Sequence, residues 1–259
     1  MKKIDLNCDM GESFGAWTMG MDGNVIPYIT SANIACGYHA GDAHVMYKTV
    51  KLAKEHGVGV GAHPGYPDLV GFGRRNMDCT PEEIRDYIAY QVGALKAFCV
   101  LHGVSLQHVK PHGSLYNMSV GNEPFIRAIV DAIAGVDKNV IYLALGGAQA
   151  PLVTKVAREA GIRVAFEAFP DRAYTPEGKL APRSLPGAVI KDPKVAAERA
   201  LRMAKEGKII TTDGSILEMQ IDTICVHGDN PSAVELVKNI RSAIEGEGIA
   251  VVPMSKFVK

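Results

Sequence analysis

Short apolar segments alternate with longer helical patterns along the whole chain, and this alternation limits the folds open to it. The sequence predicts strands at residues 3–8, 31–36, 58–62, 106–110, 140–145, 162–168, 208–212, 223–227 and 249–253. It predicts helices at residues 42–55, 81–101, 122–134, 149–160, 193–206 and 231–245. Regular alternation of strands and helices is typical of a parallel sheet that is covered by helices.

The helix boundaries carry their own signals. Thr80–Glu83 combines a capping threonine, a proline and two acidic residues, and Asp192 is likewise followed by a proline. Such residues favour the start of a helix. Glycines stand between a predicted helix and the next strand at Gly103, Gly161 and Gly207, which is the position that ends many helices.

The first predicted strand decides between an open sheet and a barrel. Its apolar residues share one face: Ile4, Leu6 and Cys8. Its polar residues share the other face: Asp5, Asn7 and Asp9. A strand of a helix-covered parallel sheet is buried on both faces, so a polar face is expected where it looks into a barrel mouth that holds a site. An edge strand with one wet face is the alternative. We therefore predict one α/β domain over residues 1–259, a (β/α) barrel with seven or eight mostly parallel strands, irregular and TIM-like.

Charge and cysteine content exclude several classes of partner. The chain has 28 basic and 28 acidic residues among 259, so no net charge draws it to nucleic acid or to an anionic membrane. No apolar run reaches the roughly 18 residues of a membrane span, and the early acidic residues do not fit a signal peptide. Five scattered cysteines argue against a disulfide framework, so the expected compartment is the cytoplasm.

Polar residues follow the predicted strands, and active sites of such barrels lie at the carboxyl ends of the strands. Those that we predict to take part in catalysis are Asp9, His39, Asp42, His63, Lys110 and His112. Those that we predict to bind substrate are Asn7, Glu12, Arg74, Tyr116, Asn117, Glu167, Asp171, Arg172, Arg183, His227 and Asp229. Four of the eight histidines stand at strand ends beside acidic residues, which favours one site.

Two of these predictions depend on local pattern. Lys110 and His112 follow His108 at alternate positions of one strand, so all three share a face and two can enter the barrel mouth. Arg183 lies in the proline-rich segment 173–190, which is either a lid or a surface excursion. It is therefore either a clamp for a substrate carboxylate or an exposed arginine.

A metal site is a competing interpretation of the same residues. Asp9, His39 and His63 supply two imidazoles and one carboxylate, a set that binds catalytic ions. The HExxH spacing and a cysteine pair are missing from the sequence, so our prediction assigns no residue to a metal. The phosphate-binding pattern GxxxxGK[ST] and a GxGxxG after a strand are missing as well.

Seven segments together resemble the LamB/YcsF family, whose members form one component of bacterial 5-oxoprolinase, its A component. They occur in the family's order from residue 5 to about residue 231: DLNCDMGESFG, SANIACGYHAGD, GAHPGYPDLVGFGRR, VKPHGSLYN, FEAFPDRAY, APRSLPGAVI and CVHGDNP. The resemblance implies a (β/α) barrel similar to polysaccharide deacetylases. It also implies ATP-dependent opening of 5-oxoproline (pyroglutamate) to L-glutamate, carried out with partner subunits B and C.

The resemblance also suggests roles for the residues. A lactam is an unreactive amide, so phosphorylation of its oxygen would prepare it for attack by water. This chemistry requires a general base, for which His39, His63 and His112 are candidates, oriented by Asp9 or Asp42. It also requires cations: Lys110 for the activated oxygen or a phosphate, and Arg74, Arg172 or Arg183 for the substrate carboxylate. ATP, as Mg-ATP, would bind in this chain in an unusual way or with a partner subunit.

Two alternatives stay open from the sequence. One is a metal-dependent deacetylase or amidohydrolase, suggested by fold kinship and by the carboxylate–histidine set, although fold kinship alone does not establish activity. The other is a non-catalytic subunit that binds a small acid for a partner's catalysis.

Overall fold

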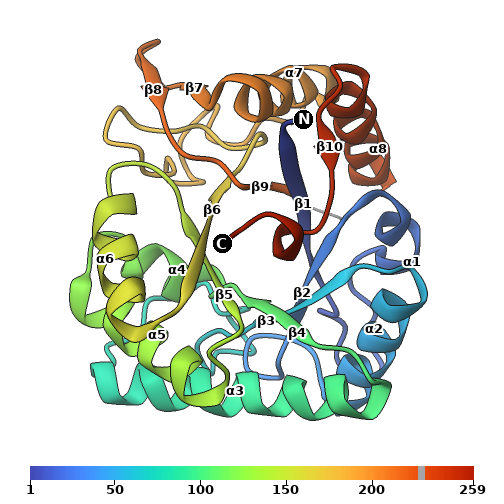
Figure 1. The fold of residues 1–259 in the computed structure, drawn as a ribbon, viewed down its shortest axis with the longest axis vertical. Coiled ribbons are helices and arrows are strands. Elements are labelled where there is room, and N and C mark those ends of the chain that lie inside the picture. Colours follow the sequence, from blue (N-terminus) through green and yellow to red (C-terminus); the bar gives the residue numbers. More distant parts are fainter. Residues whose placement is uncertain (227–230) are drawn as a thin grey trace.

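Seven parallel strands close into a barrel in the computed structural model, which describes residues 1–226 and 231–259. The strands follow one another around the barrel in the order β1 (Lys3–Met10), β2 (Ser31–Ala35), β3 (Gly59–His63), β4 (Leu106–Val109), β5 (Ile141–Leu145), β6 (Arg163–Ala168) and β9 (Thr223–Val226). β9 pairs with both β6 and β1, and this double pairing closes the sheet (Figure 1). The predicted barrel is confirmed, with seven strands.

Helices surround the barrel (Figure 1). They are α1 (Asp22–Val25), α2 (Ala43–Glu55), α3 (Pro81–His102), α4 (Gly113–Ser119), α5 (Glu123–Val136), α6 (Ala150–Ala160), α7 (Pro193–Glu206) and α8 (Pro231–Gly246), with a 3-10 turn η1 at Ile26–Tyr28. The predicted boundaries are confirmed where Thr80 forms a capping box with Glu83 and where Asp192 caps α7. Gly103 ends α3 in a left-handed conformation. Among the described helices, none has the length and apolar character needed to span a bilayer.

The predicted strand at 208–212 is confirmed only over its first three residues, and it does not belong to the barrel. β7 (Lys208–Ile210) leaves the barrel and pairs antiparallel with β8 (Ile216–Glu218) in a separate hairpin. The reason lies in the turn between them, where Asp213 accepts hydrogen bonds from Thr211 and Ser215 and Gly214 has a φ of +85°. An Asp-Gly pair between two β-forming runs is a hairpin signal.

The C-terminal segment closes the end of the barrel where the strands begin. The predicted strand 249–253 is reduced to β10 (Ala250–Val251), which pairs with the first residues of β1. The chain then turns in a 3-10 helix η2 (Met254–Lys256) that lies within the ring of strands in Figure 1. Met254 is fully buried, and its amide donates to Asp5 Oδ1 at 3.2 Å.

The middle of the barrel is filled by polar side chains that hydrogen-bond to one another. Asp5 accepts hydrogen bonds from the hydroxyls of Ser31 and Thr223 at 2.6 Å and 2.5 Å. One layer higher, Asn33 donates to Asn7 Oδ1 at 2.7 Å. Barrels of this class more often hold branched apolar residues here. Because buried polar groups must be paired, this interior fixes the register of several strands at once.

Two glycines make room for this interior. A Cβ atom at Gly59 would overlap the side-chain amide of Gln107, and one at Gly61 would overlap the ring of His108. The side chains of Gln107 and His108 therefore occupy space that a residue other than glycine would fill at positions 59 and 61. His108 uses it to reach Asn33 Oδ1 at 2.6 Å.

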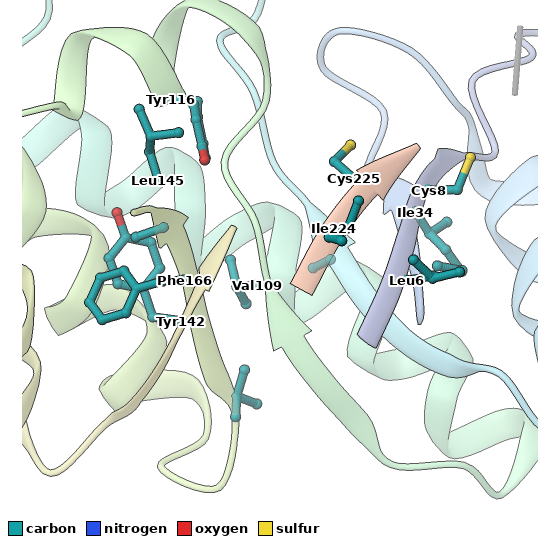
Figure 2. Packing of buried hydrophobic residues seen from close by; sticks show 14 of the residues in the cluster. Leu6, Cys8, Ile34, Val109, Tyr116, Tyr142, Leu145, Phe166, Ile224 and Cys225 are labelled. Atoms are coloured by element: carbon teal, nitrogen blue, oxygen red, sulfur yellow. The ribbon is translucent and has the colours of Figure 1, made fainter. Parts of the chain in front are cut away.

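Apolar side chains of the strands pack away from this polar interior, against the helices, whereas Ile141 and Leu143 of β5 form a separate apolar cluster with Met254. Figure 2 shows Leu6 on β1 beside Ile34 on β2, and Tyr142 beside Phe166 on the other side of the barrel. All four are at most 2% exposed and belong to one large apolar cluster. The predicted two-faced character of the first strand is therefore confirmed.

Asp5 makes the stability of the fold depend on pH. Burial raises the pKa of Asp5 to about 6, although hydrogen bonds from Ser31, Thr223 and Thr30 partly offset the rise. The protonated carboxyl of Asp5 therefore stabilises the fold fully below pH 3.8, the pKa of the same group in the unfolded chain. This stabilisation is lost as pH rises through about 6, its pKa in the folded protein. Between pH 4 and pH 7.5 we expect the wild type to lose on the order of 3 kcal/mol more unfolding free energy than Asp5→Asn.

Urea denaturation across this pH range measures the difference. Asp131→Asn on the exposed side of α5 is the control, and its pH profile should run parallel to that of the wild type. Parallel profiles for Asp5→Asn and the wild type would contradict the raised pKa.

Candidate functional site

A cavity of about 540 Å³ opens at the carboxyl ends of the strands. This volume lies within the range of small-molecule sites. The cationic residues in its lining are Arg74, Lys110, Arg172, Lys179 and Arg183. The predicted polar residues that also line it are Asp9, His63, His112, Tyr116 and Asn117. With five cations in its lining, the cavity is suited to an anionic ligand.

Lys110 lies on the floor of this cavity, directly after β4. Its Nζ is 2.9 Å from Asp9 Oδ1 on β1 and 2.9 Å from Glu167 Oε1 on β6. It also donates to Asn7 Oδ1 at 3.3 Å and contacts Cys225 Sγ on β9 at 3.2 Å. Burial by itself lowers the pKa of Lys110, but the carboxylates of Asp9 and Glu167 raise it well above its ordinary value. Lys110 is therefore a permanent ammonium group that joins four strands.

Glu167 is held in place from a second direction. It is fully buried, and the hydroxyl of Tyr116 on α4 donates to its Oε2 at 3.0 Å. Burial raises the pKa of Tyr116 well above its ordinary value, so this hydroxyl keeps its proton and remains a donor. Tyr116 and Lys110 line the cavity, whereas Glu167 supports both from below.

Three histidines and a glutamate meet beside the cavity: His63 and His112 line it, whereas His39 and Glu12 are not among its lining residues. We call His39, His63, His112 and Glu12 the histidine–glutamate cluster; each offers one ligand atom, and these atoms lie within 4.8 Å of one another. His63 Nε2 is 3.0 Å from His112 Nδ1, and His39 Nε2 is 3.4 Å from Glu12 Oε1. The rings of His39 and His112 stack with centroids 3.6 Å apart. Asp9 lies beside the cluster, with its Oδ2 3.4 Å from His63 Nε2.

Backbone carbonyls orient two of these rings. His63 Nδ1 lies 2.7 Å from the carbonyl oxygen of Lys110, and His112 Nε2 lies 2.8 Å from that of Phe72. A carbonyl oxygen only accepts, so these two nitrogens carry the ring protons. The lone pairs of His63 Nε2 and His112 Nδ1 consequently face each other across 3.0 Å.

The segment after β3 is shaped to hold these rings. Phe72 has a φ of +54°, which is strained for a residue with a side chain and aims its carbonyl at His112. A Cβ at Gly73 would lie 2.7 Å from the Cβ of His39 and 2.8 Å from His112 Cδ2. Position 73 therefore requires glycine for lack of space, and its φ of +64° also favours glycine.

Two of the rings are neutral. Burial lowers the pKa of His39 well below its ordinary value, and the nearby imidazole of His63 adds to the effect. Burial does the same for the pKa of His112, with a further effect from its two neighbouring imidazoles. Neutral imidazoles keep a lone pair for accepting a proton or binding a ligand.

Some predicted residues lie outside the cavity. Asp42 caps α2, because its carboxylate accepts from the amides of His44 and Val45 and also from Gly15. These backbone contacts lower its pKa, so Asp42 does not orient a cluster histidine in this arrangement. Asp171 is not among the described residues that line the cavity.

Others lie near the cavity in supporting positions. Asn7 and Glu167 are fully buried beneath it, bound to Lys110. Arg172 donates to the carbonyl of Ala181 at 2.6 Å, so it holds the segment 173–190 as well as lining the cavity.

His227 and Asp229 fall outside the described residues. Sequence reasoning missed Lys179, which belongs to the same segment as Arg183 and lines the cavity. It also missed Phe72, for which the flanking glycines of Gly71-Phe72-Gly73 were the available signal.

Comparisons with known proteins cover nearly the whole chain. A model described as the LamB/YcsF family matches residues 4–259. A protein of Pyrococcus furiosus, named as the A component of 5-oxoprolinase, is 56% identical over 99% of this chain and 100% of its own length. The protein of the same name from Halalkalibacterium halodurans is 48% identical over 100% of this chain and 99% of its own length. A crystal structure of the lactam utilization protein from Thermus thermophilus superposes with a TM-score of 0.89 at 47% identity, covering 96% of this chain and 99% of that one.

Removing the charge of Lys110 should lower the unfolding free energy of the protein. Lys110→Met leaves the buried carboxylate of Glu167 and the partly buried one of Asp9 without their cation, so the unfolding free energy should fall by about 3–5 kcal/mol. Adding Glu167→Gln to that variant removes one of the two charges and should restore part of the loss. Urea denaturation at pH 7 measures both.

The exposed Lys138 on the surface provides the matched control, since Lys138→Met should change the free energy by less than about 0.5 kcal/mol. A small loss in Lys110→Met, or a further loss on adding Glu167→Gln, would show that the ion pairs do not hold the floor of the cavity.

Proposed function

Because this chain belongs to the LamB/YcsF family, we propose that it is the component of an ATP-dependent 5-oxoprolinase in which the lactam of 5-oxo-L-proline is opened to L-glutamate. The reaction consumes ATP and yields ADP and phosphate. The relatives are named as the A component of 5-oxoprolinase and match this chain from end to end. We further propose subunits B and C as its partners and 5-oxoproline as its small-molecule ligand.

The observation that carries the proposal is the charge of the cavity. Five cations line it, and one of them, Lys110, is paired with two carboxylates at the floor. The substrate has a carboxylate, and a phosphorylated lactam would add a phosphate, so the ligand would bring negative charge to this lining. Arg74 and Arg183 are exposed at the rim, where a guanidinium can bind a carboxylate through two hydrogen bonds.

The chemistry begins from an amide that water attacks very slowly. Transfer of the terminal phosphoryl group of ATP to the lactam oxygen leaves ADP and converts that oxygen into part of a good leaving group. One water then adds to the ring carbon and the C–N bond breaks, which leaves the side-chain carboxyl of glutamate as an acyl phosphate. A second water hydrolyses this acyl phosphate, so one ATP and two waters give glutamate, ADP and phosphate.

The residues at the cavity floor suit this sequence of steps. The Lys110 ammonium is fixed in place before any ligand binds, so it can stabilise negative charge on the reacting oxygen without reorganisation. The facing lone pairs of His63 and His112 are positioned to take a proton from the attacking water. Asp9 lies against both Lys110 and His63 and would orient them.

ATP and the partners complete the proposal. We propose that ATP binds as Mg-ATP together with a partner subunit, because the sequence carries no phosphate-binding loop of the common pattern. We place the reaction in the cytoplasm, where free thiols such as the five of this chain persist.

Reconstitution tests the proposed function. We expect glutamate and ADP to form in equal amounts when this chain is mixed with subunits B and C, 5-oxoproline and Mg-ATP, and neither to form at that rate when any component is omitted. Turnover without this chain would contradict the proposal. Glutamate formation without ATP would favour a metal-dependent amidohydrolase instead.

Alanine variants test the catalytic assignment. In the reconstituted system, His39→Ala, His63→Ala and Lys110→Ala should each reduce turnover at least about 100-fold, the effect of losing a general base or a charge stabiliser. Circular dichroism and a thermal melt of each variant verify folding. Near-normal turnover in all three folded variants would instead support a non-catalytic binding subunit.

Arg183 provides a separate test of substrate binding. Its loss should raise the KM for 5-oxoproline by about 10- to 100-fold, because a hydrogen bond to a charged group contributes about 1.5–3 kcal/mol. Arg158→Ala, on the exposed side of α6, is the matched control and should leave KM unchanged. An unchanged KM in Arg183→Ala would place this arginine outside the binding site.

A further inference from the structure

The histidine–glutamate cluster contains more buried lone pairs than its hydrogen bonds use. His39 is fully buried, and neither of its ring nitrogens makes a hydrogen bond with any described residue. Leaving a buried polar atom without a partner costs about 1–3 kcal/mol. Two neighbouring lone pairs, on His63 and His112, face each other rather than a donor. An electron-pair acceptor placed among them would satisfy one nitrogen of each ring.

We propose that the histidine–glutamate cluster is a binding site for one divalent transition-metal ion of the zinc class. This inference does not depend on the proposed 5-oxoprolinase function, because it concerns the isolated chain and its own side chains.

The spacing of the donor atoms fits such an ion. A tetrahedral ion with bonds of about 2.0–2.1 Å holds its ligands about 3.4 Å apart. Three of the separations lie near this value, at 3.0 Å between His63 Nε2 and His112 Nδ1, 3.4 Å between His39 Nε2 and Glu12 Oε1, and 3.9 Å between His112 Nδ1 and Glu12 Oε1. All four donor atoms lie within 4.8 Å of one another.

The surroundings of two of the three rings also match those of metal ligands. A histidine that binds a metal nearly always donates its other ring N–H to a carbonyl, a carboxylate or water. His63 does so to the carbonyl of Lys110, and His112 does so to the carbonyl of Phe72. The backbone thus already fixes the tautomer in which the free nitrogen points into the cluster.

A shared proton is the competing explanation, and it accounts for less. One proton between His63 Nε2 and His112 Nδ1 would convert their contact into a hydrogen bond. It would leave both nitrogens of His39 buried and without a hydrogen bond. An ion accounts for the placement of all three rings.

The donor types select the class of ion. Three imidazole nitrogens and one carboxylate favour zinc, manganese, iron or cobalt, whereas magnesium and calcium prefer oxygen ligands. A bound ion would act there as a Lewis acid beside the cavity. His63 and His112 would then be ligands of the ion, so they would not also act as the general base.

Titration of the chelator-treated full chain with Zn²⁺ and Co²⁺ tests the site without any assay of activity. We expect one ion per chain by calorimetry, a Co²⁺ visible spectrum typical of low-coordinate nitrogen and oxygen ligation, and no displacement by millimolar Mg²⁺. A crystal grown with Zn²⁺ should show one anomalous peak within about 2.5 Å of His63 Nε2 and His112 Nδ1. This last measurement needs no variant and so does not depend on a variant's folding.

Variants then assign the ligands. Glu12→Gln and His112→Ala should each weaken Zn²⁺ binding at least about 100-fold, while the control His56→Ala, at the exposed end of α2, should bind as the wild type does. Zinc bound elsewhere, a stoichiometry far below one ion per chain, or equal affinity in Glu12→Gln and His56→Ala would overturn the proposal. In that case, an imidazole proton seen by NMR between His63 and His112 would establish the shared proton instead.

Discussion

A single buried ammonium group, that of Lys110, joins the carboxyl ends of four barrel strands. Lys110 stands where β4 ends, and its contacts reach carboxylates on β1 and β6 and a thiol on β9. Charges in a buried position are tolerated only when they are paired, so the strands that carry Asp9 and Glu167 must meet at this point. The same contacts fix a positive charge at the floor of the cavity before a ligand arrives.

The two ends of the barrel have different roles. At the end where the strands begin, Met254 and the C-terminal turn close the interior, and Asp5 links that turn to the hydroxyls of neighbouring strands. At the end where they finish, the backbone is irregular, with a strained Phe72 beside Gly73. Strain of this kind is concentrated at functional sites because a firm scaffold can hold it. Here the polar interior is that scaffold.

The cavity brings two kinds of chemistry together. Its lining contains five cations, including Arg74 and Arg183 at the rim, and two members of the histidine–glutamate cluster, His63 and His112. The cations suit a small ligand with a carboxylate, while the cluster offers lone pairs to a proton or an ion. Lys110 lies between them, and its backbone carbonyl orients His63. Lys110 therefore contacts both the cationic part of the cavity and the histidine–glutamate cluster.

The sequence by itself determined the barrel, because helix caps, glycine ends and the two faces of β1 are local signals that survive folding. It also placed His63, Lys110 and His112 at one mouth, since the carboxyl ends of parallel strands share an edge. It did not distinguish Asp42, whose carboxylate caps a helix, from residues of the cavity. Only the tertiary structure decided that, and only it grouped Glu12 with three histidines, because such contacts depend on loop conformations that bring distant segments within a few ångströms.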